Sequence, residues 1–240
     1  MAWRGWARHG LARQGETGQG KARFFMILIE GWIEGTMALL QHRMADGALD
    51  RGKTRTNVAD AKDDPRNEAD ACVYRLPDSR QIGVPSAAIA RLMREAGGAH
   101  KIKGSRKAVK YLVPAAVIVV DDLLPVFLHD RVTPVVDFEV DSRPVTIPAT
   151  KGRVMRHRAR FNEWSLSFTI RINEKILAEA LVRQLLTEGG EQIGIGDFRP
   201  EKGGPFGTFG LVSWAVVSPS LPKTTPARER NGRADERSPS

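Results

Sequence analysis

The sequence predicts an α+β fold in which one antiparallel sheet carries two helices. Short apolar segments of strand length are separated by two segments with helical periodicity, and Gly-rich or polar stretches bound most of them. The major elements follow in the order strand, helix, strand, strand, helix, strand. This order is that of the split βαβ arrangement of ferredoxin-like and RNA-recognition-motif (RRM-like) folds. We therefore expect a single ferredoxin-like domain over residues 24–217.

In the first half, residues 24–33 are apolar and β-rich, which predicts the first core strand. Residues 45–70 are rich in charged and small residues, and a long polar loop is expected there. The spacing of Ile89, Leu92, Met93 and Ala96 predicts an amphipathic helix that ends at Gly97–Gly98. Residues 112–120 are almost continuously apolar, as in a strand buried on both faces.

The second half begins with an expected β-rich insertion, strands 124–150, with candidates at 124–128 and 132–140. Residues 153–160 and 164–172 both alternate between two faces, and Asn162–Glu163 between them favours a β-hairpin. A second helix is predicted at 174–188, with Gly189 as its end. The last strand is expected at 206–217.

The net charge of this 240-residue chain is concentrated at its ends. Of the formal charge of +9, residues 1–23 contribute +4 and residues 221–240 contribute +2. We expect a basic disordered tail at 1–23 and a second disordered tail at 218–240. Alternatively, residues 1–25 are translated upstream sequence and the protein starts at Met26. The rest is only modestly basic, so a case for a polyanionic partner must rest on local clusters of charge.

Cysteine content and hydropathy exclude several classes of protein. Cys72 is the only cysteine, which excludes an internal disulfide and a zinc site built from several cysteines. The longest apolar run, residues 113–120, is too short to cross a bilayer. We expect a cytoplasmic protein without a membrane partner.

A Gly-rich stretch at 194–207 is the most distinctive motif. Its backbone would approach a phosphate closely if the glycine amides were free, and two cations lie within it. It is neither a P-loop, since no Gly-Lys-Ser/Thr follows, nor a dinucleotide fingerprint, since Arg199 stands where a third Gly belongs. The alternative is a loop that needs positive φ angles to enter the last strand. The candidate residues are Gly194, Gly196, Gly203, Gly204 and Gly207, with Arg199 and Lys202.

Two segments carry Lys and Arg without any acidic residue, at 100–110 and 151–160. Their cations are candidates for contacts with phosphates, and the two segments are expected to frame one groove. Nearby aromatic residues, Phe161, Trp164 and Phe198, offer stacking surfaces or, alternatively, core packing. The candidate cations are Lys101, Lys103, Arg106, Lys107, Lys110, Lys151, Arg153, Arg156, Arg158 and Arg160.

Catalysis has little support in the sequence. The histidines show no metal-ligand spacing, no nucleophile–base arrangement stands out, and we expect no metal and no cofactor. His42, after the first strand and beside the polar loop, is the most suggestive position for a general base.

Several motifs resemble the RAMP superfamily of CRISPR-associated RNA-binding proteins. They are the first strand ending in Gly, the segment Ile82-Gly83-Val84-Pro85-Ser86 before a helix, and Gly-Ile-Gly-Asp-Phe-Arg-Pro before the last strand. A group of bacterial and phage proteins is also similar, through residues 147–153 and the Gly-Asp-Phe-Arg-Pro stretch. The resemblance implies a ferredoxin-like fold and a non-catalytic subunit that polymerises along guide RNA.

Three functions remain open on the sequence. The first is a non-catalytic module for single-stranded nucleic acid, RNA rather than DNA, that works as a homo-oligomer or in a multi-subunit complex. The second is a phage or plasmid structural or interaction protein. The third is a metal-independent RNA endonuclease that uses His42.

Overall fold

The computed structural model describes residues 26–43, 64–77, 79–146 and 151–217. The predicted tails at 1–23 and 218–240, and the predicted polar loop up to residue 63, lie outside these residues. Within them the fold is a mixed α+β fold with antiparallel sheets, as the sequence predicts at that level. Among the described residues, no helix is both long and apolar enough to span a membrane.

The central sheet is built around β8 (Ser165–Asn173), which pairs along its whole length with β1 (Met26–Gly35). On the far side of β1 lies β9 (Phe209–Val217). The other edge of β8 pairs with β4 (Val117–Val119) and with β5 (Leu123–Phe127), and β5 also pairs with β3 (Gly83–Pro85). Because side chains alternate along a strand, the predicted apolar face of β8, Leu166, Phe168, Ile170 and Ile172, is buried.

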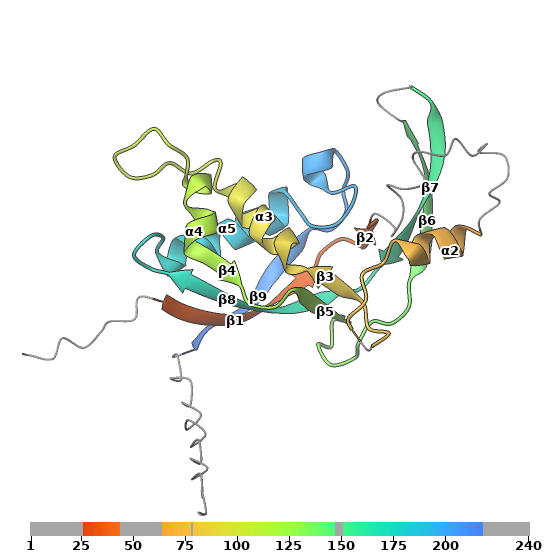
Figure 1. The fold of residues 1–240 in the computed structure, drawn as a ribbon, viewed down its shortest axis with the longest axis horizontal. Helices are drawn as coiled ribbons and strands as arrows, with labels where there is room; N and C mark the ends of the chain where they lie inside the picture. The colour runs from red at the N-terminus through yellow and green to blue at the C-terminus, as the bar shows by residue number, and fades with distance from the viewer. Residues whose placement is uncertain (1–25, 44–63, 78, 147–150, 218–240) are drawn as a thin grey trace, which may run out of the picture.

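The helices α3 (Ser86–Ala96) and α5 (Glu179–Gln192) cover one face of this sheet, together with the short α4 (Val113–Ala116) (Figure 1). The predicted stripe of α3, Ile89, Leu92, Met93 and Ala96, is buried, which confirms it. The two long helices approach closely because Gly189 has no side chain: a Cβ there would lie 2.3 Å from Cδ2 of Leu92. Two 3-10 turns, η1 (Val109–Tyr111) and η2 (Pro200–Lys202), complete the connections.

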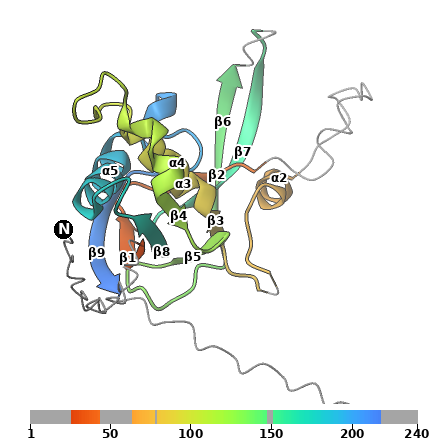
Figure 2. The same ribbon diagram turned by 60° about the vertical axis from the view of Figure 1, so that its left-hand side comes forward.

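A second, three-stranded sheet extends away from the first. Its order is β2 (Leu39–Gln41), β7 (Arg153–Phe161) and β6 (Glu139–Thr146), and α2 (Pro65–Ala71) packs beside it. Figures 1 and 2 show β6 and β7 projecting from the body of the protein as a two-stranded arm. The arm is anchored at its base, where Ala159 and Phe161 are buried in the core.

The predicted hairpin of residues 153–160 and 164–172 is wrong. The strands themselves form, but β7 pairs with β2 and β6, and β8 pairs with β1, β4 and β5. Trp164 separates them: its side chain is fully buried, and its carbonyl accepts a hydrogen bond from the Gly35 N–H at 2.8 Å. This contact directs the following residues along β1 rather than back along β7.

Four other boundaries differ from the prediction. Residues 112–120 form α4 and only a three-residue strand, since Pro114 starts a helical turn and Ile118 is exposed at the sheet edge. Residues 132–138 form no strand, and β6 begins at Glu139. The last helix is shifted, because residues 174–178 make a turn and Gly189 continues the helix by packing. The end of the predicted polar loop is α2, which Asp64 caps at the Arg66 N–H.

Candidate nucleic-acid interface

The two basic segments do not frame one groove. Residues 101–110 form an exposed loop beyond α3, closed by a bridge between Lys101 and Ala108, whereas residues 151–160 enter the arm. Figure 1 shows that loop and the arm at opposite ends of the protein. Lys101, Lys103, Arg106 and Lys107 are exposed in the loop, and the Lys110 ammonium lies 5.3 Å from the centre of the Tyr111 ring. The protein therefore has two separate cationic regions.

In the arm, Arg156, Arg158 and Arg160 share one face, as their alternation predicts, but their surroundings differ. Across the ladder Arg160 lies opposite Glu139 and Arg158 opposite Asp141. Arg156 alone lies opposite another cation, Arg143. Like charges directly opposite each other destabilise a sheet, so this pair favours a bound anion. Of the remaining candidates, Lys151 and Arg153 are exposed.

Arg158 is not at the surface. Its side chain is 5% exposed, and its Nε donates a 2.6 Å hydrogen bond to Oδ2 of Asp197 in the Gly-rich loop. The pair joins the base of the arm to that loop. A buried arginine with this partner holds its surroundings in place, and its guanidinium is not presented to a ligand at the surface.

The Gly-rich loop is a structural connection. Gly194, Gly196, Gly203 and Gly207 have φ angles between 71° and 80°, a region that favours glycine. The N–H groups of Gly194, Gly203, Gly204 and Gly207 donate to backbone carbonyls of the loop and of its neighbours. The loop lies against β2, since Asp197 donates its N–H to Leu40 and Gly207 donates to Ala38. Four of the five glycine amides are thus engaged, and the structure supports the conformational interpretation of this motif.

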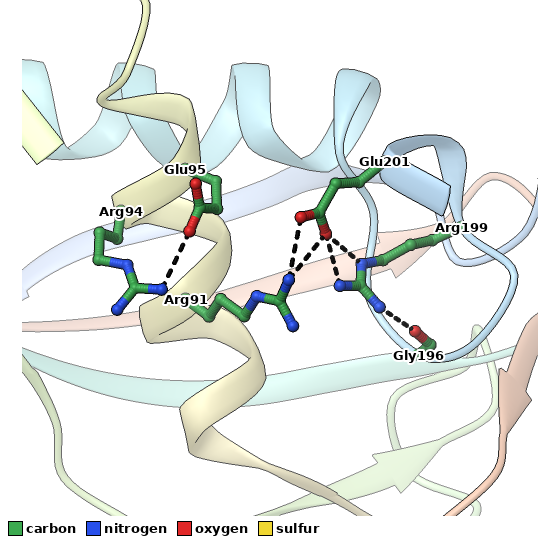
Figure 3. Close-up of polar contacts among 6 residues, drawn as sticks. All are labelled: Arg91, Arg94, Glu95, Gly196, Arg199 and Glu201. Atoms are coloured by element: carbon green, nitrogen blue, oxygen red, sulfur yellow. Dashed lines mark hydrogen bonds and ion pairs between the residues drawn. The ribbon is translucent and has the colours of Figure 1, made fainter. Parts of the chain in front are cut away.

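The loop cation Arg199 is also engaged. Figure 3 shows Arg199 and, from α3, Arg91 converging on the carboxylate of Glu201. Arg91 Nη2 donates to Glu201 Oε1 at 2.9 Å, and Arg199 Nε donates to Oε2 at 3.0 Å. A further bond from Arg199 Nη1 to the Gly196 carbonyl, 2.7 Å, fixes the loop. Burial alone would raise the pKa of Glu201, but the two guanidinium groups and Lys202 outweigh it and lower the pKa. Lys202 itself is exposed.

A groove of about 340 Å³ lies between β2, the start of α3 and the Gly-rich loop. Its apolar surface comes from Leu39, Val84, Pro85, Ala87 and Ala88. Its remaining walls carry aromatic and charged groups. They are formed by Gln41, His42, Tyr74, Arg91, Gly196 and Asp197. The groove therefore combines an apolar floor with one carboxylate and one guanidinium.

His42 and Asp197 face the groove with defined charges. Burial, followed by the positive charge of Arg156, lowers the pKa of His42 below its ordinary value, so the neutral imidazole is favoured. For Asp197, burial acts to raise the pKa, but the hydrogen bond and charge of Arg158, the Phe198 N–H and His42 together lower it. At neutral pH the groove holds a carboxylate anion and a neutral histidine. The Nδ1 atom of His42 is buried and accepts no hydrogen bond within the described residues.

The predicted stacking residues are mostly core residues. Trp164 is fully buried and donates its indole N–H to the Met37 carbonyl, and Phe161 is 3% exposed. Phe198 packs against Phe206 with ring centres 6.0 Å apart. Instead Tyr74, with Arg43 5.8 Å from its ring centre, brings an aromatic surface to the groove.

Sequence reasoning missed Tyr74, Arg91, Arg143, Asp197 and Glu201. Asp197 belongs to the Gly-rich stretch at 194–207, but its partner Arg158 lies 39 positions away in the sequence, and no local pattern connects the two residues. No group of three or more His, Cys, Asp or Glu side chains in the described residues is arranged to hold a metal ion.

Comparison with known proteins concerns the fold. No protein-family model matches this sequence, and no curated protein matches it. A chain of the cryo-EM structure of the Type III-B Cmr-beta complex bound to cognate target RNA is similar at 13% identity with a TM-score of 0.45, over 80% of this chain. The match covers 61% of that chain, so this protein spans less than two thirds of its length.

A second similar structure is the crystal structure of Cmr6 from Pyrococcus furiosus. It matches at 12% identity with a TM-score of 0.41, over 78% of this chain and 99% of that one.

Proposed function

We propose that this protein is a non-catalytic, single-stranded RNA-binding protein of ferredoxin-like fold that works as a subunit of a CRISPR-type complex. The strand order β9-β1-β8-β4 with α3 and α5 on one face supports the ferredoxin-like part of the proposal. The sequence motifs shared with the RAMP superfamily support the kind of complex. A single observation carries the RNA-binding part: the cross-strand pair of Arg143 and Arg156 beside the groove.

The protein compensates only one member of this pair: Arg143 is in an ion pair, and no ion-pair partner of Arg156 lies among the described residues. Arg143 donates through Nε to both oxygens of Asp141 at 2.9 Å, and its guanidinium lies 4.8 Å from the centre of the Phe206 ring. Arg156 adds a second positive charge directly across the ladder. A phosphate between the two guanidinium groups would remove the repulsion and form charge-assisted hydrogen bonds. RNA rather than duplex DNA fits a narrow groove with aromatic walls, which receives unstacked bases.

The loop at 101–110 supplies the second cationic region. Lys103, Arg106 and Lys107 project from it without an acidic residue in the segment. The loop is held in place from behind, since Nε2 of His100 lies 2.6 Å from Oε2 of Glu188 on α5. We assign it a role in contacting a further stretch of the same RNA or a neighbouring subunit's RNA.

The test is the salt dependence of RNA binding by the full-length protein. Fluorescence anisotropy with a labelled single-stranded RNA is measured from about 50 to 300 mM salt for the wild type, Arg156→Gln and the control Arg171→Gln. Arg171 is exposed on β8, away from the arm. Each phosphate of a single strand that the protein no longer neutralises flattens the log–log slope by about 0.7. We expect this change for Arg156→Gln only, and absence of binding by the wild type at about 50 mM salt rejects the function.

One alternative is a structural or interaction protein whose positive charges are incidental. Analytical ultracentrifugation with and without oligonucleotide separates the two. An RNA-dependent increase in assembly size supports the binding protein, whereas assembly of the same size without RNA supports the structural protein.

The other alternative, a metal-independent endonuclease, is favoured by the lowered pKa of His42 in the groove. A neutral imidazole is the form that a general base needs. Cleavage of labelled RNA in excess chelator that disappears in His42→Ala supports the nuclease, and intact RNA with the wild type rejects it.

A further inference from the structure

The groove has the chemistry of a selective site. Its floor is apolar and its walls carry Tyr74 and His42, which present flat rings. The amide of Gln41 is already satisfied, since it donates to the Gly83 carbonyl at 2.9 Å and accepts from the Tyr74 N–H at 3.0 Å. Of the other polar groups that line the groove, Asp197 and Arg91 are the charged ones, beside the neutral His42 and Tyr74.

Asp197 retains capacity to accept hydrogen bonds. Its Oδ2 accepts a hydrogen bond from Arg158 Nε, and its side chain is 32% exposed at the groove. A carboxylate has about four lone-pair sites, so further donors fit beside Arg158. The arginine behind Asp197 orients it and keeps it ionised.

Arg91 is the second charged wall. Its Nη2 is bound to Glu201, its side chain is 46% exposed, and it borders both this groove and a smaller one of about 60 Å³ beneath the Gly-rich loop. The guanidinium has five N–H donors in total, so it donates to a ligand while it stays paired with Glu201.

We propose that this groove binds one unstacked nucleobase of a single-stranded RNA and prefers guanine to uracil, an inference that rests on the proposed function. Guanine presents N–H and NH₂ donors on one edge, which suit the Asp197 carboxylate, and its O6 and N7 acceptors suit Arg91. Uracil places two carbonyl oxygens beside its single N–H, and these are repelled by a carboxylate. The volume of about 340 Å³ is near the lower end of small-molecule sites and suits one base.

The cations at the rim suit the phosphates on either side of such a base. Arg156 is on β7, which pairs with β2 immediately before His42, and its positive charge acts to lower the pKa of His42. The backbone of a strand that inserts one base thus passes between Arg156 of the arm and Arg91 of α3. An RNA is favoured over an acidic peptide because the wall opposite Arg91 is itself anionic.

The experiment compares two labelled RNAs of twelve nucleotides, an all-uridine strand and the same strand with three separated guanosines. Anisotropy titrations use the full-length wild type, Ala87→Leu, Asp197→Asn and the control Ala90→Leu. Ala87 lines the groove and is exposed, whereas Ala90, on the same helix, does not line it. Discrimination by a good bidentate contact is worth about 5- to 100-fold in affinity. We expect at least about fivefold tighter binding of the guanosine strand by the wild type and by Ala90→Leu.

The two groove variants should lose this preference to within about twofold. Asp197→Asn tests the carboxylate, and Ala87→Leu, which fills the groove without touching the buried Arg158, tests the site if the first variant is poorly folded. Equal binding of both RNAs by the wild type overturns the inference but leaves the proposed function standing. No binding of either RNA overturns both. If the wild type shows no base preference and Ala87→Leu changes the sedimentation of the RNA-free protein, the groove is a protein interface and the inference is wrong.

Discussion

Substitution of Arg158 by Ala should lower the free energy of unfolding more than substitution of any neighbouring arginine of the arm. Arg158 is 4% exposed, bonds Asp197 at 2.6 Å and lies across the ladder from Asp141, which is 7% exposed. Arg158→Ala leaves the Asp197 carboxylate without its ion-pair partner and a cavity where the arginine side chain was, whereas Asp141 stays paired with Arg143. Breaking a fully buried ion pair costs about 3–5 kcal/mol. Because the Asp197 side chain is 32% exposed, water offsets part of this cost, and we expect about 2–3 kcal/mol.

The assay is thermal and urea unfolding followed by circular dichroism, with Arg160→Ala as the matched control. Arg160 is on the same face of β7, two residues away, and its Nε donates to the Asn162 side chain at 2.7 Å near the surface. For a domain of this size about 2–3 kcal/mol corresponds to a decrease in Tm of roughly 5–10 °C. The control should change by less than about 1 kcal/mol. Equal destabilisation by the two variants would refute the assignment of Arg158 as the buried link between arm and loop.

Three further predictions concern stability. Gly207→Ala should lower the free energy of unfolding by about 3 kcal/mol or more, because φ is 71° and the new Cβ would lie 1.8 Å from the Ile195 carbonyl oxygen. Gly203→Ala should lower it by only about 1–2 kcal/mol, because φ is 77° but the space around the new Cβ is open. Equal urea midpoints for the two variants would contradict this prediction. The pKa of Glu201 is lowered in the folded protein, so its ionised carboxylate contributes to stability at pH values above its ordinary pKa of 4.5. This contribution is lost as the pH falls through the folded-state pKa, and Glu201→Gln should therefore flatten the decrease in stability at acid pH. His42 has a pKa below 6.5, so protonation favours unfolding, and His42→Asn should remove the stability loss that begins as pH falls below about 6.5.

Local patterns predicted much of the secondary structure because side-chain periodicity reports which face of an element is buried. The stripe of α3 and the alternation of β8 were both correct, since a helix or strand with one apolar face has one stable way to bury it. The glycines of the loop were recognised as either functional or conformational. Their positive φ angles and bonded amides support the conformational interpretation, and the bond from Gly207 to the Ala38 carbonyl, just before β2, exists only in the folded chain.

The sequence by itself determined the α+β class, the amphipathic α3, the strands now seen as β1, β7, β8 and β9, and the common face of the three arginines on β7. Only the tertiary structure decided that β7 and β8 belong to different sheets, that the two basic segments lie apart, and that Arg158 is buried while Arg156 faces Arg143. The reason is physical: periodicity depends on residues two positions apart in a strand and three or four apart in a helix, whereas strand pairing and charge pairing depend on residues much farther apart in the sequence. The groove of His42, Tyr74, Arg91 and Asp197 is assembled from four such distant segments, so it exists only in the folded chain.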